Sequence, residues 1–261
     1  MKLDKILAWL DKTLKVADFD DVSNNGLQVD RFPALTQNLK TSKPQTISTV
    51  AFAVDASVRA VEAAAKADAQ LLVVHHGISW GGGIKRIEGG VGAVVRAAIE
   101  NKVAIAAYHL PLDAHPVLGN NAQLAKLLGL RRVRPAFSYH GNVIGLTGEV
   151  LRYRVIEGLR LLGCSDQLKT SQLKTSNTLT LGLCSGGAGE FAEEAKRLGC
   201  DLYLTGEASW GEVIAAENCG MKMILAGHYE TEVFGVRALA AAMKKSLKLK
   251  AVDLTETLRR T

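Results

Sequence analysis

Short apolar runs alternate with helical patterns along this chain, and this alternation limits the folds that are open to it. Residues 46–54 are predicted to form a strand, and Ser57 is placed to cap the helix that follows it. Two further apolar strands are predicted at 71–75 and 103–108, with a helix at 95–101 between them. Strands that are apolar throughout and separated by helices are typical of mostly parallel sheets covered on both faces. The sequence therefore predicts an α/β fold.

The same alternation returns in the last third of the chain, after a tandem polar repeat. The five residues 167–171 are repeated at once as 172–176, and this stretch without a hydrophobic period is typical of an exposed linker. We predict an N-terminal half at 1–135 with flanking C-terminal elements, a connecting segment at 136–177 and a C-terminal half at 178–261. The strands expected in the second half are 179–184, 202–205 and 223–226, and its helices are 188–198, 212–217 and 238–243.

The two halves resemble each other in sequence. When 203–211 is laid on 73–81, identical residues fall together at Ser79/Ser209, Trp80/Trp210 and Gly81/Gly211. A shorter spacing in the second half then superposes 224–228 on 105–109. This places His228 on His109, and each of these histidines has an acid four residues further on, Glu232 and Asp113. These matches favour an internal duplication. The alternative is that any two strand–turn–helix units look alike.

Composition and charge exclude several classes of protein. Hydrophobic residues make up 48% of the 261 residues and charged residues 22%, which is typical of a globular protein. No apolar run approaches the roughly 18 residues of a membrane span, and Asp4 and Lys5 interrupt what would be a signal peptide. The four cysteines show no paired spacing, so neither a zinc finger nor a disulfide scaffold is expected. We predict a cytoplasmic protein that does not bind membranes.

A mild basic excess gives the chain a formal net charge of +6. It is concentrated in one cluster of arginines and one of lysines. A solvated helix face or strand edge explains such clusters better than binding to nucleic acid, with weak attraction to phosphate-bearing ligands as the alternative. The clusters are Arg131, Arg132 and Arg134, and Lys244, Lys245, Lys248 and Lys250.

Four of the six histidines lie at or just past the carboxyl end of a predicted strand: His75, His76, His109 and His228. Ligands of open α/β sheets bind at that edge. A single histidine there is more often structural, but a group of them indicates a site. Adjacent side chains diverge along an extended strand, so His75 and His76 need either two ions or a bend at Gly77 to act together.

Imidazoles and carboxylates in this combination indicate a metal site. His75, His76 and His228 with Asp113 and Glu232 provide three imidazoles and two carboxylates, which suit two borderline divalent ions such as zinc, manganese, iron or cobalt. A carboxylate that bridges ions ~3.5–4 Å apart leaves room for the shared hydroxide of two-metal hydrolysis. For Asp113 alone, capping of local amides is an equal alternative.

Six blocks of sequence, in order and spread over essentially the whole chain, resemble the NIF-three-like family, whose members are also labelled GTP cyclohydrolase 1 type 2 homologues. The blocks are 25–29 (Asn-Gly-Leu-Gln-Val), 75–77 (His-His-Gly), 109–116 (His-Leu-Pro-Leu-Asp-Ala-His-Pro), 119–122 (Gly-Asn-Asn-Ala), 205–207 (Thr-Gly-Glu) and 227–232 (Gly-His-Tyr-Glu-Thr-Glu). The linker repeat departs from the family pattern, and the large insertion of longer members is absent.

The resemblance implies a two-domain α/β fold, a dinuclear metal centre and a ring-shaped homohexamer with sites facing its interior. Carried over by motif, the metal ligands are His75, His76, Asp113, His228 and Glu232, with Asp113 as the bridge. The family labels range from cyclohydrolase to metal-dependent hydrolase to transcription-factor partner, so the resemblance leaves the activity open.

A dinuclear-metal-dependent hydrolase is the favoured function, with a purine nucleotide or phosphoester as the small-molecule substrate. His109 could then act as a proton shuttle or support a ligand, and Glu207 and Tyr229 could orient the substrate, although a helix-start carboxylate and a packed aromatic explain the last two equally well. The alternative is a non-catalytic metal-binding protein with a regulatory, interaction or delivery role. DNA binding through the basic clusters is a third hypothesis.

Overall fold

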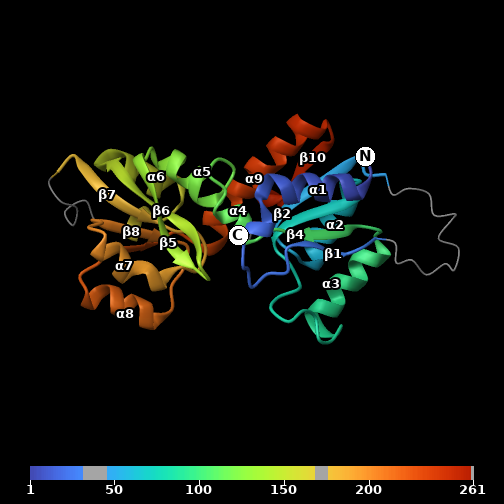
Figure 1. Ribbon diagram of the computed structural model, residues 1–261, viewed down its shortest axis with the longest axis horizontal. Helices are drawn as coiled ribbons and strands as arrows, with labels where there is room; N and C mark the ends of the chain where they lie inside the picture. Colours follow the sequence, from blue (N-terminus) through green and yellow to red (C-terminus); the bar gives the residue numbers. More distant parts are fainter. Residues whose placement is uncertain (32–45, 168–175, 260–261) are drawn as a thin grey trace, which may run out of the picture. The chain divides into compact units, whose positions relative to one another are not determined.

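The computed structural model describes residues 1–31, 46–167 and 176–259, which form two compact units (Figure 1). Unit 1 consists of Met1–Leu112 and Val236–Thr261, and unit 2 of Asp113–Gly235. Most of the tandem polar repeat, at 168–175, lies outside the described residues. Each unit is a mixed α/β structure built on one five-stranded sheet.

The sheet of unit 1 has the strand order β1-β4-β3-β2-β10. Its three central strands are parallel and almost entirely buried, β10 adds parallel to β2, and β1 pairs antiparallel with β4. Buried β-branched and small apolar residues on both faces are what a sheet between two layers of helices requires. The strands are β1 (Gly26–Val29), β2 (Thr49–Asp55), β3 (Leu71–His76), β4 (Ala104–Ala107) and β10 (Lys250–Asp253).

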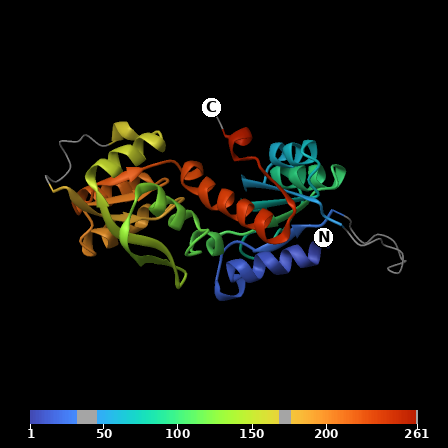
Figure 2. The same ribbon diagram turned by 90° about the horizontal axis from the view of Figure 1, so that it is seen from above.

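Helices cover both faces of this sheet. Helices α2 (Val58–Lys66) and α3 (Gly89–Glu100) share one apolar core with strands β2, β3 and β4, and Figure 2 shows α1 (Leu3–Leu14) on the opposite face. The Ser57 hydroxyl accepts a hydrogen bond from the Ala60 N–H at 3.1 Å, so the predicted cap of α2 is confirmed. Helix α3 begins at Gly89, earlier than the predicted helix. The sequence did not indicate these first turns, because they are rich in glycine and lack an apolar period.

The sheet of unit 2 has the strand order β5-β6-β7-β8-β9. Strands β7, β8 and β9 are parallel, whereas β5 and β6 form an antiparallel hairpin whose second strand pairs antiparallel with β7. The end of β5 and all of β6 fall in the segment for which the sequence predicts only a connection, and β5 begins in the predicted N-terminal half. The strands are β5 (Arg131–Tyr139), β6 (Asn142–Leu151), β7 (Thr178–Leu183), β8 (Leu202–Thr205) and β9 (Met223–Leu225).

Two pairs of helices sandwich the sheet of unit 2 (Figure 1). Helices α5 (Asn120–Leu128) and α6 (Arg152–Leu161) share an apolar core with β7 and β8 on one face, and α7 (Ala192–Arg197) and α8 (Trp210–Asn218) lie on the other. An aromatic group fills the second face, where the Phe137 ring stacks on Phe191 at 5.6 Å and meets the edge of Tyr203 at 5.3 Å.

The chain passes from one unit to the other inside two helices, α4 (Leu110–Asp113) and the 20-residue α9 (His228–Leu247). After α9 it adds β10 and α10 (Thr255–Leu258) to unit 1. The unit boundaries therefore fall at 112/113 and 235/236, whereas the sequence predicts boundaries near 135 and 177. None of the helices in the described ranges combines the length and the hydropathy that a membrane span requires.

The pairing of strands tests the proposed duplication. In unit 1, Ala53 pairs with Val74, and in unit 2, Leu183 pairs with Leu204. These are equivalent positions when the shift that lays 203–211 on 73–81 is extended to the preceding strand. The next pair of strands does not keep the predicted register. Val74 faces Ala107, whereas Leu204 faces Ile224 and not Ala226, the expected partner. The first part of the predicted alignment agrees with the pairing, and the duplication stays a proposal.

The central strand of unit 2 provides a test of its core. Leu204 is 1% exposed in β8, so Leu204→Ala should lower the free energy of unfolding by about 2–5 kcal/mol through lost burial and a residual cavity. Urea unfolding followed by circular dichroism measures this. Leu198→Ala is the control, because Leu198 is 51% exposed and its truncation should change the free energy by less than about 0.5 kcal/mol. Equal losses in the two variants would contradict the assignment of this core.

Candidate metal centre

Three imidazoles meet at the carboxyl edge of the sheet in unit 1, and we call them the histidine cluster: His75, His76 and His109. His75 and His76 end strand β3, and His109 follows the end of β4, the parallel neighbour of β3. The ring of His75 lies 4.6 Å from that of His76 and 5.0 Å from that of His109, centroid to centroid. One ligand nitrogen from each residue lies within 4.8 Å of the others, so the cluster can hold a metal ion.

Each ring of the cluster is held through its Nδ1 atom. The acceptor for His75 is the Tyr108 carbonyl oxygen at 3.0 Å, that for His76 is Asp55 Oδ1 at 2.8 Å, and that for His109 is Asp21 Oδ1 at 2.9 Å. A hydrogen at Nδ1 places the lone pair of a neutral imidazole on Nε2. Hydrogen bonds of this kind fix the tautomer and orientation of metal-binding histidines in other proteins.

These acceptors explain why the rings of two adjacent histidines, His75 and His76, lie close together. Regular strand geometry predicts that the side chains of His75 and His76 diverge, and the structure shows instead that their rings lie close together. The acceptor for His75 belongs to the residue after β4, and the acceptor for His76 ends β2, on the other side of β3. Each ring is turned by a different neighbouring strand at the point where β3 ends.

Asp21 holds both the side chain and the backbone around His109. Its two oxygens accept hydrogen bonds from His109 Nδ1, the Leu110 N–H, the Ser23 N–H and Asn25 Nδ2, all at 2.9 Å. Burial alone would raise the pKa of Asp21, but the hydrogen bond and charge of His109, with the other donors, lower it below its ordinary value. Asp21 is therefore an ionised partner for the imidazole.

A buried carboxylate lies at the start of unit 2. Asp113, the last residue of α4, is 6% exposed. Its Oδ1 accepts hydrogen bonds from Asn120 Nδ2 at 2.9 Å and from the Ser185 hydroxyl at 3.0 Å. The Asn120 side chain also accepts from the Gly235 N–H at 2.7 Å, which ties this carboxylate to α9. These hydrogen bonds fix the orientation of the Asp113 carboxylate.

His228 and Glu232 lie one turn apart at the start of α9, with His228 Nε2 3.2 Å from Glu232 Oε1. On the other side of the ring, Nδ1 lies 2.9 Å from Glu207 Oε1. Gly186 leaves the space for this pair, because a Cβ there would come within 2.5 Å of Glu232 Oε1 and 3.4 Å of His228 Nε2. His228 thus repeats the arrangement of the histidine cluster, with a carboxylate at Nδ1.

Burial and nearby carboxylates shift the pKa values of His228 and Cys184 in unit 2. The hydrogen bond to Glu232 and its charge, together with those of Glu207, raise the pKa of His228 to about 9 against the effect of burial. Burial, with the charges of Asp113, Glu232 and Glu190, raises the pKa of the Cys184 thiol well above its ordinary value. Without a bound metal ion, Cys184 is therefore a neutral thiol.

The donor chemistry of both units fits borderline divalent metal ions. Unit 1 offers Nε2 atoms from three anchored imidazoles, and unit 2 offers one imidazole and two buried carboxylates in a space that a glycine keeps open. Imidazole with carboxylate suits zinc, iron, manganese or cobalt better than calcium. All five predicted ligands therefore lie in ligand-like settings within their own units.

The structure places the other predicted site residues close to His228. Glu207 contacts its ring, as described, and Tyr229 is the next residue along α9. Their roles toward a substrate stay predictions. Sequence reasoning did not name Asp21, Asp55, Asn120 or Trp80 as site residues. Asp55 could have been found, because it directly follows a fully buried strand beside the one that ends in His75 and His76.

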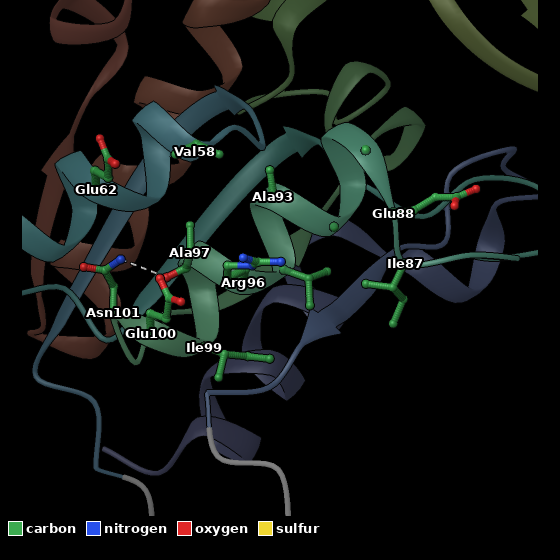
Figure 3. Close-up of a pocket in the computed structure, with 13 residues that line it drawn as sticks. Val58, Glu62, Ile87, Glu88, Ala93, Arg96, Ala97, Ile99, Glu100 and Asn101 are labelled. Atoms are coloured by element: carbon green, nitrogen blue, oxygen red, sulfur yellow. Dashed lines mark hydrogen bonds between the residues drawn. The ribbon is translucent and has the colours of Figure 1, made fainter.

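A separate pocket of about 680 Å³ lies against helices α2 and α3 (Figure 3). Apolar Val58, Ile87 and Ile99 and charged Glu62 and Arg96 are among the residues that line it. No member of the histidine cluster and no acceptor that anchors it belongs to this lining. The pocket is therefore distinct from the candidate metal centre.

Comparison with known proteins identifies the family. The model of the Duf34/NIF3 (NGG1p interacting factor 3) family matches residues 1–258, and the chain belongs to this family. A protein of Pyrococcus horikoshii named GTP cyclohydrolase 1 type 2 homolog is 35% identical over 256 residues, 97% of each chain. A protein of Deinococcus radiodurans with the same name is 38% identical over 248 residues, 92% of this chain and 88% of the relative.

Solved structures agree with the fold. Protein ybgI, described as of unknown function, has a TM-score of 0.79 at 29% identity and covers 97% of both chains. TTHA1606 from Thermus thermophilus has a TM-score of 0.77 at 32% identity, over 97% of this chain and 98% of that one. The resemblance to the NIF-three-like family that the sequence motifs indicate is thus confirmed, as is the α/β fold.

The raised pKa of His228 predicts how the metal-free protein responds to pH. Its pKa in the unfolded chain is about 6.5, so its stabilising charge is fully present below that pH and is lost as the pH rises through about 9. NMR titration of metal-free protein should show this imidazole titrating near 9. Glu207→Gln should lower the midpoint, whereas the control Glu217→Gln, exposed on α8, should leave it unchanged. A wild-type midpoint at or below 6.5 would contradict the assigned ion pairs.

Proposed function

We propose that this protein is a metal-dependent hydrolase with a dinuclear centre, whose ligands are His75, His76, Asp113, His228 and Glu232. The observation that carries the proposal is the anchoring of the imidazoles through Nδ1, which directs Nε2 of His75 and His76 as ligand atoms, while Nε2 of His228 lies beside a second proposed ligand, Glu232. The names of the relatives add support, since a GTP cyclohydrolase is a hydrolytic enzyme. Asp113 would act as the bridging carboxylate in this proposal.

Two bound divalent ions would supply Lewis-acid polarisation and an activated water for attack on carbon or phosphorus. Asn120 and Ser185 hold Asp113 in place for this role through their hydrogen bonds to Oδ1. Glu207 holds the ring of His228 through Nδ1. Fixed ligands of this kind reduce the reorganisation that a reaction at the centre requires.

His109 is the proposed proton-transfer residue. Its Nδ1 is held by the ionised Asp21, so Nε2 can accept a proton while the carboxylate stabilises the resulting imidazolium. The pair lies within one unit and beside His75 and His76. Glu207 and Tyr229 are proposed to orient the substrate, and a purine nucleotide or a phosphoester is the proposed substrate.

A second candidate function is a metal-binding protein with a regulatory, interaction or delivery role. The family description, NGG1p interacting factor 3, favours this alternative. It uses the same ligands but requires no proton-transfer residue. We also propose, on the family resemblance, a cytoplasmic homohexamer, which sedimentation or light scattering of the purified chain would test.

Metal content tests the centre itself. Protein purified without affinity-tag nickel should bind two divalent ions per chain, and His228→Ala or Asp113→Ala should lower the stoichiometry by about one ion. Inductively coupled plasma mass spectrometry measures this. His140→Asn and Glu193→Ala are the matched controls, because both residues are exposed and asparagine tolerates the positive φ of His140. Full metal content in the two ligand variants would exclude the centre.

Turnover tests the hydrolase. The metal-loaded protein should hydrolyse GTP or another nucleotide or phosphoester, and Asp113→Ala should abolish this. Asp21→Asn should lower kcat about 10²–10⁴-fold while the metal content stays at the wild-type value, because Asp21 holds His109, which is not among the five proposed ligands. Activity equal in the wild type and in Asp113→Ala would favour the non-catalytic alternative.

A further inference from the structure

A tryptophan lies at the edge of the histidine cluster and has no role in the function proposed above. The Trp80 ring lies 5.1 Å from His109 in an edge-on arrangement, at 77°, and 6.1 Å from His76, centroid to centroid. Trp80 is 38% exposed, so a large part of its side chain is open to solvent beside the candidate ligands. We infer that Trp80 is a binding platform on which a flat heteroaromatic ring of the substrate, of the purine kind, stacks. This inference rests on the proposed function.

The loop that carries Trp80 is held rigidly by residues 22–28. Gln28 Oε1 accepts hydrogen bonds from the Ile78 N–H at 2.7 Å and the Ser79 N–H at 3.1 Å. Gly77 makes this possible, because a Cβ there would come within 2.2 Å of that oxygen. A β-bridge joins Ser23 to Trp80 itself. A ring fixed before a ligand arrives loses little conformational freedom on binding, which is the property of an effective platform.

The polar atom of the indole is already used. Trp80 Nε1 donates a hydrogen bond to the Gly77 carbonyl oxygen at 3.0 Å. The exposed part of the side chain therefore offers aromatic surface and no further donor to a ligand. Stacking on such a surface is favourable for any base, because every base has a π-face. The assigned ligand chemistry is accordingly a planar heteroaromatic ring rather than a particular pattern of hydrogen-bonding groups.

The chain provides its own control for this role. Trp210 occupies the position that corresponds to Trp80 when 203–211 is laid on 73–81, but it is the first residue of α8 and is 76% exposed. No ring contact of Trp210 is among those of the described residues. An exposed tryptophan without a neighbouring cluster should contribute nothing to binding of an aromatic ligand.

The test measures binding of GTP, with inorganic tripolyphosphate as the probe that lacks a base, to the full metal-loaded chain. Trp80→Leu keeps apolar bulk but removes the aromatic surface, and it should raise the Kd for GTP about ten- to hundredfold while leaving that for tripolyphosphate unchanged. Trp80→Phe should retain most of the affinity. GTP should quench the tryptophan fluorescence of the wild type and of Trp210→Phe, and the quenching should be absent in Trp80→Phe and Trp80→Leu.

Three results would overturn the inference. The first is failure of the wild type to bind GTP, and the second is an equal Kd for GTP in the wild type and Trp80→Leu. The third is an equal loss of affinity for GTP and tripolyphosphate in Trp80→Leu, which would show that the ring only supports the loop. Failure of the hydrolase proposal can be told apart from failure of this inference. Base-dependent binding and quenching without turnover would retain Trp80 as a platform, whereas turnover with an unchanged KM in Trp80→Leu would retain the hydrolase alone.

Discussion

A contact at Nδ1 orients each imidazole of the candidate metal centre, and for His75, His76 and His109 a hydrogen bond there makes Nε2 the atom that can bind a metal. An imidazole can present either nitrogen, and only a fixed acceptor on one side decides which of them carries the lone pair. In this protein the acceptors are a backbone carbonyl oxygen for His75 and carboxylates for His76, His109 and His228. Each acceptor comes from a different strand or loop than its histidine, so the sheet edges must form before the ligand atoms are set.

The two units provide these acceptors by the same means. In each, an acceptor lies at or just past the end of a parallel strand, namely Asp55 and Tyr108 in unit 1 and Glu207 in unit 2, whereas Asp21 lies in the segment before β1. The equal register of the first two parallel strands in both units agrees with the proposed duplication, whereas the register of the next pair differs between the units. Gly77 leaves space for the Gln28 side chain and Gly186 leaves space for that of Glu232, because a Cβ at either glycine would clash with them.

The family assignment and the site carry different parts of the functional argument. Membership of the Duf34/NIF3 family follows from a match over nearly the whole chain, and relatives named GTP cyclohydrolase 1 type 2 homolog share about a third of their residues with it. A name does not define a reaction, since one fold can hold several chemistries. The proposed proton transfer depends on the ionised Asp21, which accepts a hydrogen bond from His109.

Sequence reasoning alone was enough to predict the α/β class, most of the parallel strands, the family and the histidines at the strand ends. These follow from local information: apolar runs of strand length, the cap at Ser57, and residue types at fixed spacing. The antiparallel hairpin of β5 and β6 was not predicted, because glycines, arginines and a proline obscure its alternation. Nor could the sequence place Asp21 against His109, 88 residues away, or bring the rings of His75 and His76 together. Those contacts come from the folded arrangement, because each depends on which strand ends lie side by side in the sheet.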